Sequence, residues 1–321
     1  MADGEATSEL VVWVDRDRQD LVREVLDGLG SSWRVLGIGG PAGALPDDLC
    51  KALSLSCEAD LRKLVIDRPA RVVLVASAVP PGEAEILEAA ERCDLVVFAE
   101  LPAERLEQIG GLRKRLGGDG GQMVFSPELL ASPGMQAAND PGDLLGEGRL
   151  ATLEFELEKS SGLLSAGLFQ AWLAALGMVG LPEEVSASLV GGRLEGERLL
   201  GGSLAVSGRS MGREAVLLAV TDQTGRWQRR MRVIGDGGSL ELTDEGYRLM
   251  GADGSLIDAW TGEKMGRGGL IAREIKRCME GYGVERGMSA GMLDRVVACC
   301  RASVLSLRTG QSESPEKLLG M

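Results

Sequence analysis

The chain contains no histidine among its 321 residues. Histidine is the side chain that most often moves protons near neutral pH, and it is also the commonest metal ligand. Its absence excludes any mechanism that depends on an imidazole as proton carrier. A zinc site would have to be built from thiolates and carboxylates alone, which is an uncommon ligand set. We therefore expect no metal site.

Cysteine is sparse, and none of the six cysteines form a C-x-x-C pair. They are Cys50, Cys57, Cys93, Cys278, Cys299 and Cys300. The adjacent Cys299 and Cys300 fall within an apolar helical pattern, so we expect them to fill a core rather than to carry redox chemistry. The N-terminal residues lack the basic and apolar blocks of a signal peptide, and no apolar run reaches the length of about 20 residues that spans a bilayer. The sequence therefore predicts a protein of the reducing cytoplasm.

Aromatic residues make up only 3% of the chain, whereas glycine accounts for 46 residues, so the cores must consist mainly of Leu, Val, Ala and Ile. The net charge of −13 argues against a nucleic-acid partner, because phosphate binding needs a concentrated Lys and Arg surface. It equally disfavours an anionic membrane surface. The length allows two domains, each with its own core.

Residues 10–100 alternate short apolar runs with helical stretches, which is the pattern of a parallel α/β sheet. The expected strands are residues 10–14, 33–38, 71–76 and 94–98, with 122–125 as a further edge. The expected helices cover residues 15–29 and 83–92, and another opens at Pro46.

The pattern changes at about residue 126. Residues 126–149 are rich in Pro, Gly, Ala and Asp and are typical of a segment that crosses between domains. Strict alternation over residues 151–158 predicts a half-exposed strand, and an apolar helix follows at about 163–178. Further expected strands are residues 185–190, 203–207, 214–221, 227–235 and 238–242, with hairpin-type turns at 235–238 and 253–254 and two helical stretches over 268–308. Together these predict an antiparallel sheet with one helix-covered face.

Four stretches resemble motifs of the Gfo/Idh/MocA family, nicotinamide-dependent oxidoreductases that act mostly on sugars and polyols. Residues 162–172 resemble the family's G-x-L-x-D-x-G-x-H-x-x-D, and residues 180–185 its G-x-P-x-x-V. Residues 233–240 resemble I-G-x-x-G-S-L, and residues 306–315 the closing S-x-R-T-G-x-x-E. Each motif is moderately specific, but their order and spacing together argue against chance.

The resemblance implies an α/β fold. Residues 1–125 would form a Rossmann-like parallel sheet, in relatives the dinucleotide-binding domain. Residues 126–321 would form a C-terminal α+β domain of the Gfo/Idh/MocA type, built on a large, mainly antiparallel open sheet. In many relatives the exposed face of that sheet mediates oligomers, so we expect a homo-oligomer or hetero-oligomer formed through it. The implied ligands are a sugar or a nucleotide, with NAD(P) as cofactor only if the dinucleotide site is retained.

The family's chemistry needs four elements, and each is altered here. The first is a glycine-rich turn after the first strand, where bare backbone approaches a pyrophosphate. After Val14 the chain instead has residues 15–20, with three carboxylates and no glycine. Asp15 and Arg16 are the candidate cofactor contacts in this turn, but its carboxylates would repel a phosphate.

The second element is the acid at the end of the second strand, which in relatives holds the adenosine ribose. Gly39 and Gly40 stand at this place and are further candidate cofactor contacts, as is Ser77 after the third expected strand. An alternative register remains open, because residues 37–42 match G-x-G-x-x-A directly after a strand. Prolines at 41 and 46 delay the next helix and weaken that alternative.

The third element is an E-K-P motif whose lysine contacts substrate and nicotinamide in relatives. Here Glu100 and Pro102 remain as candidate cofactor contacts, and Leu101 replaces the lysine. The fourth is the acid and histidine of the helix motif, which handle the proton that accompanies hydride transfer. Ser165 and Phe169 stand in their places. Neither side chain titrates near neutral pH, as general acid–base catalysis requires.

We therefore assign no catalytic residue and expect a degenerate relative that acts as a scaffold, a binding module or a partner of an active enzyme. One alternative is an active NAD(P)-dependent oxidoreductase on a sugar or polyol with a rearranged proton carrier. Its candidates would be Glu100, Asp94, Lys159 and Lys264. Another alternative is a sugar- or nucleotide-binding regulator without turnover, which the sequence does not distinguish from the first.

Overall fold

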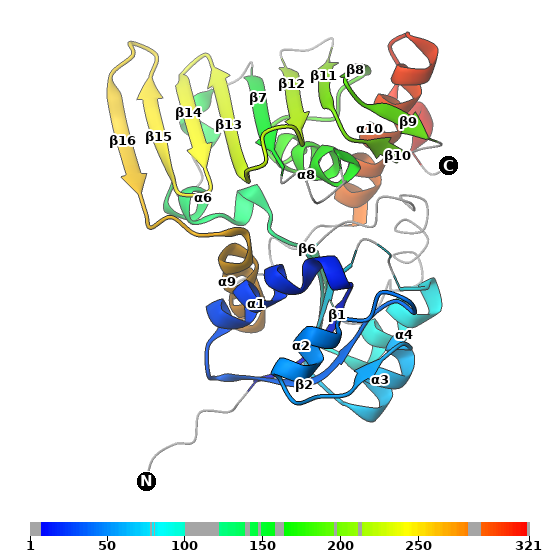
Figure 1. The fold of residues 1–321 in the computed structure, drawn as a ribbon. Helices are drawn as coiled ribbons and strands as arrows, with labels where there is room; N and C mark the ends of the chain where they lie inside the picture. Colours follow the sequence, from blue (N-terminus) through cyan, green and yellow to red (C-terminus); the bar gives the residue numbers. More distant parts are fainter. Residues whose placement is uncertain are drawn as a thin grey trace. The chain divides into compact units, whose positions relative to one another are not determined.

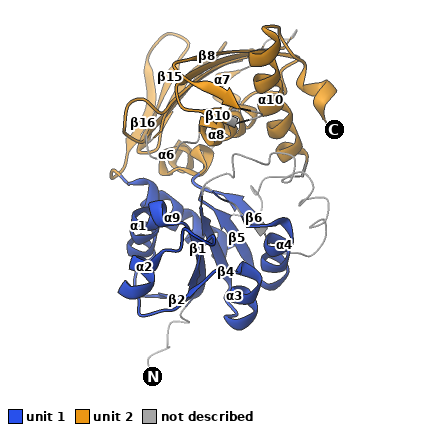
Figure 2. Cartoon of the chain, turned by 45° about the vertical axis from the view of Figure 1, so that its right-hand side comes forward, with its two compact units in different colours: residues 1–127, 265–288 blue, residues 128–264, 289–321 orange. Residues whose placement is uncertain are grey.

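The structure is a computed structural model that describes residues 8–77, 79, 81–99, 122–138, 142–146, 149–157, 164–195, 198–210, 214–281 and 290–319. The chain divides into two compact units (Figure 2). Unit 1 contains residues 1–127 and 265–288, and unit 2 contains residues 128–264 and 289–321. Unit 1 is therefore built from two separate parts of the sequence.

Unit 1 is organised around a six-stranded parallel sheet in the order β3-β2-β1-β4-β5-β6. Its strands β1, β2 and β6 are labelled in Figure 1. Its strands are β1 (Ser8–Val14), β2 (Trp33–Gly39), β3 (Cys57–Glu58), β4 (Val72–Ala76), β5 (Leu95–Phe98) and β6 (Gln122–Phe125). Strands β1 and β4 are buried on both faces over most of their length, which explains why the sequence has continuous apolar runs there. The strand order reverses between β1 and β4, the point at which open α/β sheets bind ligands beyond the carboxyl ends of their strands.

The helices of unit 1 are η1 (Arg16–Arg18), α1 (Gln19–Leu29), α2 (Asp47–Ala52), α3 (Leu61–Asp67), α4 (Glu83–Arg92) and α9 (Arg267–Met279). Helices α1 and α9 pack closely through glycine: a Cβ added at Gly28 would lie 2.8 Å from the Cβ of Ala272. The apolar side of α9, including Ile271 and Ile275, joins the same core cluster as Val22 and Val25 of α1. The expected second domain, residues 126–321, thus differs from the observed division, because α9 completes unit 1.

Unit 2 contains an eight-stranded mixed sheet in the order β16-β15-β14-β13-β7-β12-β11-β8. The strands are β7 (Arg149–Glu156), β8 (Glu184–Val190), β11 (Ser203–Arg209), β12 (Glu214–Thr221), β13 (Gln228–Gly235), β14 (Gly238–Thr243), β15 (Gly246–Gly251) and β16 (Leu256–Thr261). The β7–β12 pair is parallel and the other neighbours are antiparallel. A small hairpin joins β9 (Arg193–Glu195) to β10 (Arg198–Leu200).

One face of this sheet is covered and the other is open. Helices α6 (Pro133–Ala138), α8 (Leu164–Leu176) and α10 (Ala290–Thr309) pack on the sheet, with the short α7 (Gly142–Leu145), η2 (Leu129–Ala131) and η5 (Pro315–Leu318) around it. Side chains alternate accordingly: Met231 and Val233 of β13 are buried, whereas Arg230 and Arg232 are exposed. This confirms the expected α+β arrangement. No helix within the described ranges is long and apolar enough to cross a membrane.

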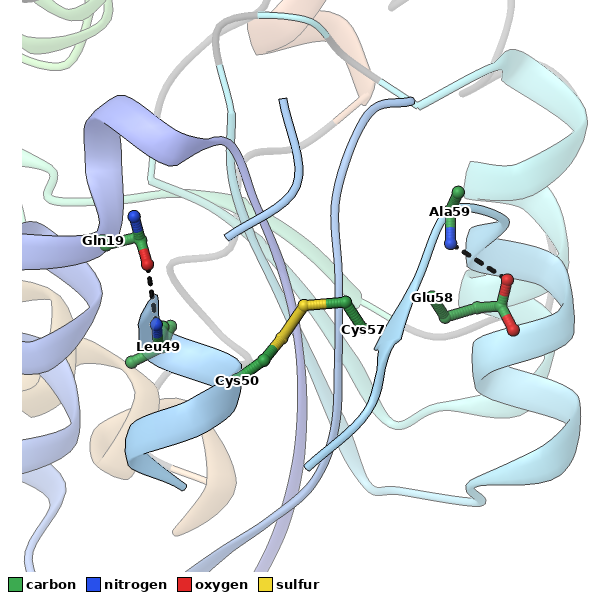
Figure 3. The surroundings of a disulfide bond; sticks show 6 residues. All are labelled: Gln19, Leu49, Cys50, Cys57, Glu58 and Ala59. Carbon is green, nitrogen blue, oxygen red and sulfur yellow. Dashed lines mark hydrogen bonds between the residues drawn. A yellow bond between two sulfur atoms is a disulfide. The ribbon is translucent and has the colours of Figure 1, made fainter. Parts of the chain in front are cut away.

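A disulfide joins Cys50 of α2 to Cys57 of β3 (Figure 3). The sequence did not predict this bond, because a spacing of seven residues matches no redox or metal motif. Cys299 and Cys300 lie buried in α10 at 0% and 1% exposure, and their expected role as core filling is confirmed.

Candidate functional site

The turn from β1 into α1 lies where a dinucleotide-binding fold presents helix amides to a pyrophosphate. Here Asp15 and Arg18 form a buried ion pair, with Arg18 Nη1 3.2 Å from Asp15 Oδ2 and both side chains under 10% exposed. The backbone N–H of Arg16 donates to the carbonyl oxygen of Ala44 at 3.0 Å. One amide of this turn is therefore occupied by the loop after β2, and the charge of Arg18 is balanced locally.

Gln19, the first residue of α1, ties the same turn to α2. Its Nε2 donates to the carbonyl oxygen of Arg16 at 2.9 Å. Its Oε1 accepts the backbone N–H of Leu49 (Figure 3), at a distance of 2.7 Å. The side chain of Gln19 is nearly buried. The chain thus fills the surroundings of the β1–α1 turn with its own polar groups.

Gly39 and Gly40 are glycines because of close packing. A Cβ added at Gly39 would lie 2.7 Å from the carbonyl oxygen of Glu58, and one at Gly40 would lie 2.2 Å from that of Val14. The alternative register is not supported, because Gly39 lies at the end of strand β2 and α2 begins only at Asp47. Residues 37–42 therefore do not form a strand–turn–helix that would cradle a phosphate.

The remaining carboxyl ends of the sheet are also bonded within unit 1. Ser77, which follows β4, is fully buried, and its Oγ donates to the carbonyl oxygen of Val79 at 2.8 Å. Arg267 of α9 donates to the carbonyl oxygen of Ala99 at 2.7 Å, and the Ser126 hydroxyl donates to Glu274 of α9. The sequence did not predict these contacts, since α9 is distant in the chain. The positions Glu100, Leu101 and Pro102 lie outside the described residues, as does Lys159.

Helix α8 of unit 2 presents the positions of the family's acid and histidine. The Oγ of Ser165 accepts the backbone N–H of Leu199 at 3.1 Å, so this side chain holds β10. Phe169 has no exposed surface. Trp172 is equally buried, and its Nε1 donates to Ser303 Oγ of α10 at 3.1 Å. All three side chains pack inside unit 2.

An arginine that sequence reasoning missed lies beside this helix. Arg229 of β13 is 1% exposed; its Nε is 3.1 Å from Asp244 Oδ1, and its Nη1 donates to Gln170 Oε1 of α8 at 3.0 Å. Its guanidinium carbon lies 5.8 Å from the ring centre of Phe155 and 5.2 Å from that of Trp227. The signal was available, because strand alternation places Arg229 on the same face as the apolar Met231.

The other proposed proton carriers occupy exposed positions. Asp94 pairs with Arg71 at 2.7 Å, and both side chains are more than half exposed. Asp94 precedes β5 and therefore lies at the amino end of the sheet, away from the ligand-binding edge. Lys264 is 86% exposed and lies 4.0 Å from Glu245. Among the residues whose structure is described, no three acidic or cysteine side chains gather into a metal site.

Solved structures share this architecture. An oxidoreductase from Agrobacterium radiobacter, in complex with NAD+, L-tartaric acid and magnesium, superposes with a TM-score of 0.73 at 12% identity, covering 98% of this chain and 100% of that chain. An oxidoreductase from Sinorhizobium meliloti gives 0.75 at 15% identity, covering 96% and 99%. GenD2 of gentamicin A biosynthesis, in complex with NAD, gives 0.68 at 14% identity, covering 98% of both chains.

The chain shares the fold of these solved oxidoreductases. The predicted fold class, a Rossmann-like parallel sheet followed by a large, mainly antiparallel sheet, is confirmed. At identities this low the likeness concerns the fold alone. The sequence matches no protein-family model, and it matches no curated protein.

Proposed function

We propose that this chain is a catalytically degenerate relative of the Gfo/Idh/MocA oxidoreductases, which works in the cytoplasm as a scaffold or as a partner subunit. The observation that carries the proposal is the β1–α1 turn. Its Arg16 amide is bonded to Ala44, and its Arg18 is paired with Asp15. A cofactor would have to displace contacts that the chain makes with itself.

The residues present do not fit the pyrophosphate of NAD(P). Pyrophosphate binding uses free backbone amides at a helix start and excess positive charge. The turn instead offers the Asp15 carboxylate, which repels a phosphate, and an arginine that this carboxylate already neutralises. At the end of β2, Gly39 brings no carboxylate to hold a ribose, and Glu58 of β3 is paired with Lys63 at 2.6 Å.

The two positions that carry the proton in the family supply no carrier here. Ser165 bonds to the backbone of β10, and Phe169 is fully buried in α8. Hydride transfer to or from a carbinol requires a group that takes up or releases the accompanying proton. These two positions supply neither a titratable group nor access to a substrate.

The partner we propose is a second copy of the chain, bound through the open face of the unit 2 sheet. Strand register places Arg230 opposite Glu154, and Arg232 opposite Glu241, so charges of both signs alternate across this face. Exposed Leu217 adds an apolar contact. A face with both signs of charge can complement itself across a two-fold axis.

Two measurements test this proposal. Because a ligand that binds only the native state raises the melting temperature, we expect millimolar NAD, NADH, NADP and NADPH to leave it unchanged, while an NAD-binding oxidoreductase of the same fold responds. An upward shift of several degrees would show that a nucleotide binds and would contradict the degenerate site. Polyol-dependent reduction of a nicotinamide would establish the active enzyme. In sedimentation, we expect a dimer that Arg232→Glu weakens; a monomer at micromolar concentration contradicts the partner role.

A further inference from the structure

The Cys50–Cys57 disulfide lies in the segment that closes the β1–α1 turn. Cys50 follows Leu49, whose backbone N–H is bonded to Gln19 of α1 (Figure 3). The loop that leads into this helix supplies Ala44, which accepts the Arg16 amide. The disulfide therefore anchors residues 40–57 from their far end, while hydrogen bonds hold their near end to the turn.

The two cysteine residues differ in exposure. Cys50 is 4% exposed and belongs to the apolar core cluster of unit 1. Cys57 is partly exposed on β3, a two-residue strand at the edge of the sheet. Thiol–disulfide exchange proceeds by attack of a thiolate on a sulfur that it can reach. Attack is therefore directed to the sulfur of Cys57, and Cys50 becomes the leaving thiol.

The ring closed by the disulfide contains a left-handed turn. Ser54 has a φ of 55°, a conformation that is costly for residues other than glycine. The turn is closed by the Leu55 N–H, which donates to the carbonyl oxygen of Cys50 at 2.9 Å. Opening the disulfide removes the covalent restraint that helps to hold Ser54 in this conformation. The backbone of the freed segment can then relax to a less costly conformation.

Three of the four free cysteines do not compete for this exchange, whereas the fourth, Cys278, is partly exposed. Burial raises the pKa of Cys93, the other buried thiol of unit 1, to about 11. Burial likewise raises the pKa of Cys299 and of Cys300 in unit 2. The thiolate is the reactive form. Because these groups stay protonated, they do not attack the disulfide or scramble it.

We propose that the Cys50–Cys57 bond is a reversible redox site, whose reduction by a dithiol releases residues 40–57 from the β1–α1 turn. The dithiol's thiolate attacks Cys57, breaks the bond and expels Cys50. Its second thiol then displaces Cys57, so the dithiol leaves as a disulfide and two electrons and two protons reach the protein. In the reducing cytoplasm that the sequence predicts, disulfides are mainly transient or redox-sensing.

The first test follows the folded wild-type protein through dithiothreitol reduction, by thiol trapping with intact mass and by hydrogen exchange. We expect trapping of Cys50 and Cys57 without denaturant. We also expect exchange of the Arg16 amide and of residues 40–57 to accelerate at least about tenfold, as for a locally opened unit. Resistance to reduction until urea unfolds the chain, or reduction without faster exchange, would overturn the proposal.

The second test separates the two sulfurs. Treated with oxidised glutathione, Cys50→Ser should form a mixed disulfide at Cys57 at least about tenfold faster than Cys57→Ser forms one at Cys50. Equal rates, or the reverse order, would refute the inference that attack is directed to Cys57. Cys278→Ser is the matched control, since Cys278 is a partly exposed thiol of the same unit, and its exchange pattern should respond to dithiothreitol as wild type does. Neither test uses a nucleotide. Its outcome is therefore independent of whether the proposed function, which is tested by nucleotide binding, holds or fails.

Discussion

Replacing Arg229 by methionine tests how helix α8 is held in unit 2. The substitution keeps an unbranched apolar stem but removes a guanidinium that is bonded to Asp244 and Gln170 and lies over two aromatic rings. Asp244 is only 9% exposed, so it would lose its charged partner in a buried place.

Breaking a buried ion pair by removing one partner costs about 3–5 kcal/mol, because an uncompensated charge remains. We expect Arg229→Met to lower the free energy of unfolding by that amount. Most of the loss should come from the stranded carboxylate. The double variant with Asp244→Asn removes that charge, and we expect it to recover roughly half of the loss or more.

Urea unfolding followed by circular dichroism measures both variants. Trp227 fluorescence reports on the site itself, because this ring lies against the guanidinium. A single variant that loses less than about 1 kcal/mol would show that Arg229 is not a structural centre of unit 2. A double variant as unstable as the single one would refute the stranded-charge explanation.

Three further predictions concern the packing and the charges described above. Phe169→His restores the family's residue type. It should lower the free energy of unfolding by about 2–4 kcal/mol, since it exchanges buried apolar surface for a polar ring, and it should yield no dehydrogenase activity. A stable, active variant would show that the position faces a substrate. Gly40→Ala should cost about 1–3 kcal/mol of stability, because the added methyl group clashes with the β1 backbone. Gly291→Ala, in open space on α10, should stabilise the protein by about 0.5–1 kcal/mol. Equal urea unfolding midpoints for the two variants would contradict this prediction. The hydrogen bond from Lys63 lowers the pKa of Glu58 below its ordinary value of 4.5. The contribution of Glu58 to stability is therefore complete above pH 4.5 and is lost as the pH falls through the lowered pKa. Carboxyl titration by NMR should show the pKa of Glu58 rising in Lys63→Ala.

Much of the sheet architecture could be predicted from hydrophobic patterning. The expected strand at residues 214–221 matches β12, and the turn at residues 235–238 is the β13–β14 hairpin. These segments obey period-two alternation because one face of the sheet is buried. Strand β16 escaped prediction for the same reason: all its residues are exposed, so it carries no alternation.

From the sequence one could predict which functional groups the site lacks, but not the contacts that replace them. The sequence showed that Ser165 and Phe169 replace titratable groups, but not that Ser165 bonds to Leu199. Contacts such as Arg16 to Ala44 join backbone atoms, which leave no trace in residue identity. The Cys50–Cys57 bond was missed because its spacing fits no known motif.

The return of α9 to unit 1 has a consequence for the order of assembly during translation. The side of α1 that carries Val22, Val25 and Leu29 shares its core cluster with Ile271 and Ile275, which leave the ribosome only after the whole eight-stranded sheet. At ribosomal speed this delay lasts roughly ten seconds or more. Unit 1 is therefore synthesised first but completed late. Until α9 emerges, the apolar surface of the nascent unit that α9 will cover stays exposed.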